Sequence, residues 1–96
     1  MKHIAYLADF CAKNGVNEVV ISPGSRNAPI VIAVENHPTI NTHLIHDERA
    51  AAFFALGLAE ACDKPVALTC TSGSALLNYA PALVEAYYRQ IPLLVL

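Results

Sequence analysis

The spacing of the apolar residues switches repeatedly between a helical and a strand pattern, and this alternation limits the possible folds more than any other feature. Ile4, Leu7 and Cys11 recur at helical spacing, and the run 19–21 is short, apolar and β-branched, as in a buried strand. The alternation continues, with helices expected at 28–34, 48–61 and 75–88 and strands at 40–45, 65–70 and 93–96. Short loops between these segments predict an α/β fold, an open parallel sheet with helices on both faces.

Three residues are expected to mark helix ends. Gly15 follows the first helix in the position that glycine commonly takes after a helix. Asp47 precedes the third helix and is a candidate N-cap. Pro81 falls inside the last apolar segment, where it is expected either to kink the helix or to divide it in two.

The composition is that of one core-rich domain and argues against several classes of protein. Of the 96 residues, 55% are hydrophobic and 15% are charged, and the net charge of -2 provides no basic face for nucleic acid. The longest nearly apolar run, 50–58, is far shorter than the ~20 residues that span a bilayer. The first residues lack the pattern of a secretory signal. We therefore expect a cytoplasmic protein that binds neither nucleic acid nor membranes.

The three cysteines, Cys11, Cys62 and Cys70, are scattered and lack the spacing of metal ligands. They are interpreted as buried, reduced thiols, and no metal site is expected within this chain. Residues 92–96 have the pattern of a buried strand, which is an unusual end for a complete domain. The chain is therefore expected to be part of a longer polypeptide.

The polar chemistry of the chain is concentrated in three strand-to-helix loops, at 22–26, 46–49 and 71–74. In a parallel sheet such loops lie at one edge, outside the carboxyl ends of the strands, where ligands bind. In the first loop, Gly24 allows close backbone approach, and Ser25 and Arg26 favour an anion such as a carboxylate. A Pro-Gly turn beside a solvated arginine explains the same residues without a ligand.

Glu48 is the main candidate for acid/base chemistry. Acidic residues are common in the first turn of a helix, so a capping role is the simpler alternative. However, residues 50–59 are apolar on every side, which predicts a helix buried in a core or against a partner subunit. Glu48 would then lie at the mouth of a dry interface, where its proton becomes usable. Together with His46 it forms H-x-E, but the P-C-x-x-C of zinc deaminases is missing.

The sequence of all three loops resembles one enzyme family. The segment 22–29, S-P-G-S-R-N-A-P, is similar to the A/S-P-G-S-R-S/N-x-P motif of 2-succinyl-5-enolpyruvyl-6-hydroxy-3-cyclohexene-1-carboxylate synthases of menaquinone biosynthesis. Residues 47–59 resemble that family's D-E-R-x-x-x-F-x-A-L-G-L-A, and residues 71–86 its T-S-G-T-A-x-x-N-x-x-P-A-x-x-E-A. The resemblance extends over nearly the whole chain, and the departure is Ser74 in place of threonine.

The resemblance implies the N-terminal part of a pyrimidine-binding domain over 1–96, from a thiamine-diphosphate enzyme. Glu48 matches the glutamate that hydrogen-bonds N1′ of the aminopyrimidine and so assists removal of the C2 proton. Pro23 and Gly24 are expected to contact the cofactor, and Ser25 and Arg26 the isochorismate side of the substrate site. The family decarboxylates 2-oxoglutarate and adds the succinyl group to isochorismate.

The same resemblance places several parts of the enzyme outside this chain. The diphosphate and its Mg²⁺ or Mn²⁺ ion are expected in a separate C-terminal domain. The active site is expected between subunits of a homodimer or tetramer, so this piece alone is expected to be inactive. Two alternatives stay open: another thiamine-diphosphate enzyme, such as an acetolactate synthase or a decarboxylase, and a non-catalytic α/β module for small-anion binding or subunit interaction.

Overall fold

The helices and strands alternate along the chain as the sequence predicts. The computed structural model describes residues 2–96. The elements are α1 (Lys2–Lys13), β1 (Glu18–Ile21), α2 (Ala28–Glu35), β2 (Asn41–Leu44), α3 (Glu48–Cys62), β3 (Val66–Thr69), α4 (Ser74–Leu77), α5 (Ala80–Arg89) and β4 (Leu93–Val95).

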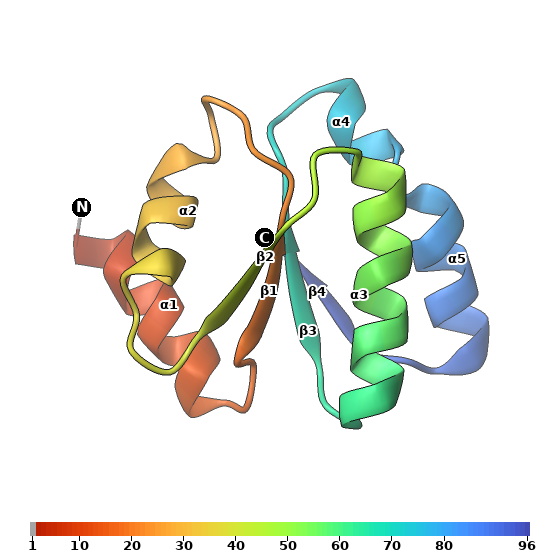
Figure 1. Ribbon diagram of the computed structural model, residues 1–96, viewed down its shortest axis with the longest axis horizontal. Helices are drawn as coiled ribbons and strands as arrows, with labels where there is room; N and C mark the ends of the chain where they lie inside the picture. The colour runs from red at the N-terminus through yellow and green to blue at the C-terminus, as the bar shows by residue number, and fades with distance from the viewer. Residues whose placement is uncertain (1) are drawn as a thin grey trace.

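The strands form one parallel sheet in the order β2-β1-β3-β4, which confirms the predicted fold class. The helices α1 and α2 cover one face, and α3 and α5 cover the other (Figure 1). The chain crosses from β1 to β2 in one direction and from β2 over β1 to β3 in the other. The strand order therefore reverses between β1 and β3, where sheets of this type open a crevice for ligands.

Each face of the sheet has its own core because successive strand residues point to opposite faces. Val19 and Ile21 of β1 pack with the side of α1 and α2, whereas Val20 packs with α3 and α5. On the α3 side the core is lined by small residues, which lets the helices approach the sheet closely. These are Ala51, Ala52, Ala55, Ala59 and Ala82.

The expected helix ends are present. The Asp47 side chain caps α3 by accepting a hydrogen bond from the Ala50 backbone N–H at 2.9 Å. Gly15 has φ +84°, and the Val16 N–H donates to the Cys11 carbonyl at 2.9 Å, as in a Schellman motif. Pro81 lies in the first turn of α5, so the last apolar segment is divided into α4 and α5 rather than kinked.

The structure leaves one expectation about burial open and corrects another. Within the chain α3 is buried on one face: Phe53 and Phe54 are 41% and 42% exposed because only one face of α3 meets the sheet, and burial of these side chains against a partner subunit stays a prediction. Among the cysteines, Cys11 is buried, Cys70 is partly buried, and Cys62 is exposed in the last turn of α3. All three are free thiols, as expected.

Candidate functional site

The three polar loops meet at the carboxyl edge of the sheet. Gly24 of the first loop lies so close to the third loop that a Cβ placed on it would be 2.5 Å from Cβ of Thr71. Beside this contact, Arg26 Nη1 donates a hydrogen bond of 2.9 Å to Oγ of Ser72. Glycine is required at position 24 because any side chain there would push the two loops apart. The first and third loops thus form one surface across the reversal in strand order.

Buried polar side chains hold the first loop in place. Ser22 is fully buried, and its hydroxyl donates to the Ile45 carbonyl at 2.7 Å, which ties the first loop to the second. Asn27 is 3% exposed, and its Nδ2 donates to the Ser22 carbonyl at 3.1 Å and to Oγ1 of Thr69 at 3.5 Å. These contacts leave Oδ1 of Asn27 buried without a partner among residues 2–96.

Glu48 is the first residue of α3 and is half-buried. The N-cap hydrogen bond of α3 comes from its neighbour Asp47, whose carboxylate accepts the Ala50 N–H. Glu48 lies in the first turn, where a negative charge complements the helix dipole, as the simpler alternative expected. Within residues 2–96 the Glu48 carboxyl has neither a hydrogen bond nor an ion pair of its own. A half-buried carboxyl that the fold does not use for capping is available to hydrogen-bond a ligand.

Tyr79 lies beneath the same edge, between α4 and α5, and is the largest fully buried side chain. Its hydroxyl has no hydrogen-bond partner in the part of the chain that the structure describes. Burial raises the pKa of Tyr79 most, the Cys70 thiol and the charge of Glu48 raise it further, and the Ser22 hydroxyl lowers it slightly. An unpaired buried hydroxyl costs about 1–3 kcal/mol, so its retention at this position requires an explanation.

A hollow of about 250 Å³ opens between the first and third loops. It combines a guanidinium and hydroxyls with apolar walls, the composition expected of a site for a small anionic molecule. Its lining residues are Arg26, Asn27, Ile30, Cys70, Thr71, Ser72, Leu76 and Leu96.

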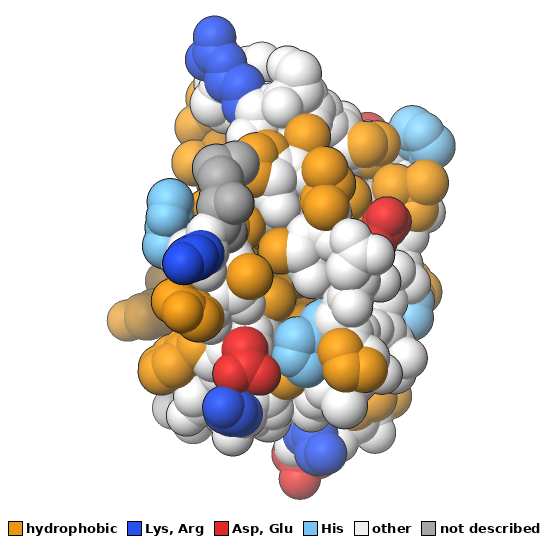
Figure 2. Space-filling model, turned by 90° about the vertical axis from the view of Figure 1, so that its left-hand side faces the viewer, with side chains coloured by type: hydrophobic (Ala, Val, Ile, Leu, Met, Phe, Trp, Pro, Cys, Tyr) orange, Lys and Arg blue, Asp and Glu red, His pale blue; other side chains and the backbone are white. Residues whose placement is uncertain are grey.

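A larger hollow of about 430 Å³ lies between α1 and α2, but it offers few polar side chains to a ligand. It is lined mainly by apolar residues, and His37 is its one titratable side chain among the described residues. Figure 2 views this side of the molecule, where hydrophobic side chains are interspersed with a few charged ones. The smaller hollow at the sheet edge is therefore the better candidate site.

The structure places every predicted site residue at the carboxyl edge. Gly24 and Arg26 contact the third loop directly, and Glu48 lies at the second loop, which Ser22 ties to the first. Pro23 and Ser25 are exposed on the first loop. Within residues 2–96, no group of three or more histidine, cysteine or acidic side chains is arranged to hold a metal ion.

Sequence reasoning missed Asn27, the buried hydroxyl of Ser22, and Tyr79. For Ser22 and Asn27 a signal existed, because both flank the Pro-Gly turn between a buried strand and a helix. Tyr79 had no such signal, since a tyrosine in an apolar helical segment is ordinarily a surface or core residue.

No described helix is both long and apolar enough to span a bilayer. A family model described as thiamine pyrophosphate enzyme, N-terminal TPP binding domain, matches residues 1–96.

Two curated proteins are similar to this chain over most of its length, and both are named 2-succinyl-5-enolpyruvyl-6-hydroxy-3-cyclohexene-1-carboxylate synthase. The protein from Flavobacterium psychrophilum is 58% identical over 90 residues, which cover 94% of this chain. The protein from Geobacillus kaustophilus is 56% identical over 94 residues, which cover 98% of this chain. The chain spans only 16% of the length of either relative.

A solved structure has the same fold. Benzoylformate decarboxylase from Polynucleobacter necessarius matches with a TM-score of 0.82 and 29% sequence identity. The match covers 98% of this chain and 17% of that one.

Proposed function

The chain belongs to the family of N-terminal TPP binding domains of thiamine pyrophosphate enzymes, and from this premise we propose the function of the whole protein. We propose that it is a 2-succinyl-5-enolpyruvyl-6-hydroxy-3-cyclohexene-1-carboxylate synthase, of which residues 1–96 form the N-terminal part of the pyrimidine-binding domain. The identity of 58% and 56% with proteins of that name supports this choice. One observation supports the mechanism above the others. The Glu48 carboxyl lies half-buried at the carboxyl edge and does not form the N-cap hydrogen bond of the helix.

The residues at this edge fit the pyrimidine end of thiamine diphosphate. A ring nitrogen needs a carboxyl partner that the fold has not already engaged, and Glu48 is such a group because Asp47 caps the helix. We assign Glu48 to the pyrimidine N1′, and Pro23 and Gly24 to backbone contacts with the cofactor. When bound, thiamine diphosphate supplies the acidic carbon and the electron sink needed for decarboxylation and carbon–carbon bond formation.

Glu48 is proposed to act as an acid/base group. It holds a proton at the pyrimidine N1′ and exchanges it during the reaction, which requires shielding from bulk water. Phe53 and Phe54 support such shielding, because they expose an apolar surface on the same helix. We propose that a second subunit of a homodimer or tetramer covers this surface, so that the active site forms between subunits.

The substrates are proposed to be isochorismate and 2-oxoglutarate, and Ser25 and Arg26 are proposed to bind the isochorismate side through a carboxylate. One Arg26 nitrogen bonds Ser72, which orients the guanidinium beside the hollow and leaves its other N–H groups for a bidentate contact. The diphosphate and its Mg²⁺ or Mn²⁺ ion are proposed to bind to parts of the protein outside residues 1–96. A cytoplasmic location remains a prediction from the sequence.

A second candidate is a thiamine-diphosphate enzyme with another substrate, of the acetolactate synthase or decarboxylase type. The likeness to benzoylformate decarboxylase favours it, at a lower identity of 29%. Assays of the full-length protein with isochorismate plus 2-oxoglutarate, with pyruvate and with benzoylformate separate these activities. The proposed function predicts turnover with the first pair alone.

Glu48→Gln in the full-length protein tests the mechanism. The substitution keeps the size of the side chain and removes its acid/base capacity, so succinyl transfer is expected to fall by about 10²–10⁴-fold. Glu35→Gln, at an exposed glutamate in the last turn of α2, is the matched control and is expected to keep full activity. Near-normal turnover in Glu48→Gln would remove Glu48 from its role. A non-catalytic module predicts instead that Glu48→Gln leaves binding or assembly unchanged, whereas Phe54→Asp abolishes it.

A further inference from the structure

Ser72 places a hydroxyl beside the arginine of the first loop. It lies in the third loop, between β3 and α4, and is exposed. Its Oγ is 2.9 Å from Nη1 of Arg26, a residue 46 positions away in the sequence. The hydrogen bond therefore joins two separate loops at the carboxyl edge of the sheet.

The chemistry of the two groups fixes the direction of this hydrogen bond. A guanidinium has donors and no acceptor, so Arg26 donates and Oγ of Ser72 accepts. The hydroxyl hydrogen of Ser72 is not used in this bond, and it has no acceptor in the part of the chain that the structure describes. Ser72 is thus free to donate this hydrogen to a ligand while it stays bonded to Arg26.

The backbone at both ends of the bond is held in place. A Cβ placed on Gly24 would be 2.5 Å from Cβ of Thr71, so the two loops are in contact one residue before Ser72. Next to Arg26, Asn27 is buried, and its Nδ2 donates to a backbone carbonyl of the first loop at 3.1 Å. The two side chains start from a fixed separation, which limits the entropy lost when they bind a ligand together.

The bond contributes little to the fold and leaves the arginine charged. Both side chains are exposed, and a hydrogen bond that is open to water adds little net stability. Within residues 2–96 Arg26 forms no ion pair with an acidic side chain. A carboxylate in the place of Ser72 would neutralise the guanidinium and compete with an anionic ligand, whereas a hydroxyl does neither.

The hollow beside these groups has the chemistry of a site for a carboxylate on an apolar body. Arg26 and Ser72 both line this space of about 250 Å³, and Ile30 and Leu76 contribute apolar walls. A carboxylate has lone pairs enough to accept from the arginine N–H groups and from the serine O–H at once. The apolar part of the same molecule would then lie along the aliphatic side chains.

We propose that Ser72 is a further substrate-binding residue, which donates its hydroxyl hydrogen to the same carboxylate that Arg26 binds. The inference rests on the role proposed for Arg26, so the carboxylate is that of isochorismate. Arg26 supplies the positive charge, and Ser72 supplies a neutral donor whose position is set by the bond between them. Binding of 2-oxoglutarate does not involve Ser72.

The test is Ser72→Ala in the full-length protein with saturating thiamine diphosphate and Mg²⁺, with kcat and KM measured for each substrate. Loss of a hydrogen bond to a charged group is expected to raise the KM for isochorismate about tenfold. The kcat and the KM for 2-oxoglutarate are expected to stay unchanged, because the bond is made equally in the ground state and the transition state. Ser72→Thr keeps the hydroxyl at an exposed position and is expected to restore the wild-type KM.

Two controls make the result specific. Thr39→Ala removes an exposed hydroxyl at the amino end of the sheet, 3.3 Å from Nδ1 of His37, and is expected to leave both KM values unchanged. In an Arg26→Ala background, Ser72→Ala is expected to raise the KM for isochorismate much less than in the wild type, because both residues bind one carboxylate. Thermal denaturation of Ser72→Ala is expected to give the wild-type Tm.

The possible results separate this inference from the proposed function. An unchanged KM for isochorismate in Ser72→Ala, with a raised KM in Arg26→Ala, would overturn the inference alone. A higher KM for both substrates with a lower Tm, or no rescue by Ser72→Thr, would also overturn it, since Ser72 would then support the loop rather than the substrate. If the wild type does not turn over isochorismate, or if Arg26→Ala keeps the wild-type KM, the proposed function itself fails and this inference fails with it.

Discussion

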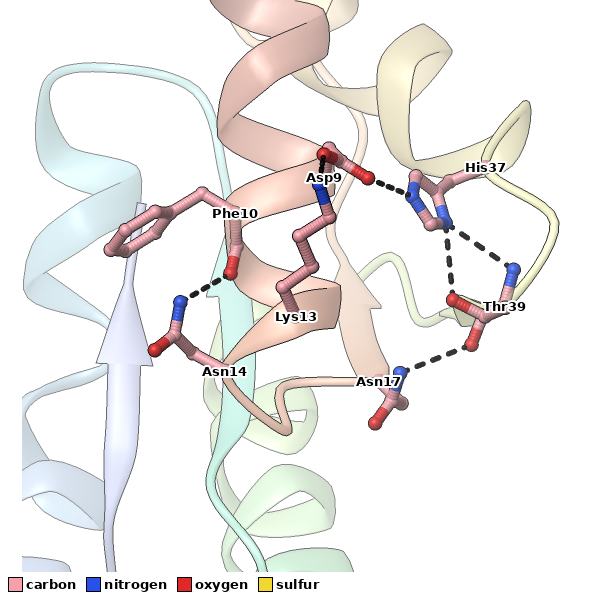
Figure 3. Close-up of polar contacts among 7 residues, drawn as sticks. All are labelled: Asp9, Phe10, Lys13, Asn14, Asn17, His37 and Thr39. Atoms are coloured by element: carbon pink, nitrogen blue, oxygen red, sulfur yellow. Dashed lines mark hydrogen bonds and ion pairs between the residues drawn. The ribbon is translucent and has the colours of Figure 1, made fainter.

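The two ends of the sheet differ in whether their polar side chains have partners within the chain. At the amino end a connected set of polar groups is paired within the chain. Oδ2 of Asp9 lies 2.8 Å from Nζ of Lys13, and Oδ1 lies 3.4 Å from Nε2 of His37 (Figure 3). Nδ1 of His37 in turn accepts from the Thr39 N–H, and Thr39 O accepts from Nδ2 of Asn17.

At the carboxyl end, two buried polar side-chain atoms lack hydrogen-bond partners among the described residues. The two such side-chain atoms in residues 2–96 are Asn27 Oδ1 and Tyr79 Oη, and both lie under the three loops. Glu48 at the same end is likewise unpaired, and Gly24 is held against Thr71 with no space for a side chain. Proteins pair buried polar groups where only stability matters and leave them available where ligands bind. The difference indicates that the amino end serves the fold and the carboxyl end serves a ligand.

Among substitutions at the two ends of the sheet, Gly24→Ala is expected to have the largest effect on stability and activity. The added methyl group would overlap Thr71, so we expect a loss of about 1–3 kcal/mol in the free energy of unfolding. A displacement of the loops by about 1 Å is expected to lower kcat/KM by up to about 10²-fold. Activity assays and chemical denaturation of the full-length protein measure the two losses.

Gly15→Ala at the amino end is the matched control. Gly15 has φ +84° but no heavy atom within 4 Å of a Cβ placed there. The substitution is therefore expected to cost about 1 kcal/mol through backbone strain, with kcat/KM unchanged. Equal losses of activity in Gly24→Ala and Gly15→Ala would contradict the assignment of the amino end to stability and of the carboxyl end to ligand binding.

Glu18→Gln is expected to destabilise the fold by about 1 kcal/mol at neutral pH and to leave activity intact. Glu18 accepts hydrogen bonds from Asn41 at 2.7 Å and contacts His43 at 2.8 Å. Burial raises the pKa of Glu18, but these two partners outweigh it and lower the pKa below its ordinary 4.5.

This shift gives the glutamate a defined effect of pH on stability. Because the folded-state pKa is the lower one, the contribution of Glu18 is present above pH 4.5 and is lost as the pH falls through the lowered value. Denaturation of wild type and Glu18→Gln between pH 7 and pH values below 4.5 measures it. The two curves are expected to converge at the acid end, and a constant gap would contradict the assignment.

Gln90→Gly is expected to have the smallest effect. Unlike the other substitutions, it is expected to stabilise the protein. Gln90 ends α5 in the left-handed conformation, with φ 56°, which glycine adopts without strain. We expect the free energy of unfolding to rise by about 1 kcal/mol with no change in kcat/KM. Thermal denaturation checks the first expectation, and a lower Tm would show that the Gln90 side chain makes an important contact.

Much of this architecture could be predicted from the sequence. The alternating apolar spacing fixed the order of helices and strands, and a parallel sheet then required the three loops to share an edge. The Asp47 cap was predictable because its signal is local. The contact of Gly24 with Thr71 was not, because it depends on how two loops distant in sequence are aligned by the sheet.

Burial was the other quantity that the sequence left undetermined. Phe53 and Phe54 are of a residue type that is usually buried in the core. They are exposed here because the sheet covers only one face of their helix. Tyr79 is buried because α4 and α5 separate at that point and the alanines of α3 leave space for the ring. Both outcomes are decided by packing between elements, which local patterns do not encode.

Glu48 is proposed to exchange a proton with the cofactor at the carboxyl edge. The most direct measurement is the rate at which the C2 proton of bound thiamine diphosphate exchanges with deuterium, followed by NMR in the full-length protein. We predict that Glu48→Gln slows this exchange by about 10²-fold or more, whereas Glu35→Gln leaves it unchanged. Equal exchange rates in the wild type and Glu48→Gln would contradict the claim.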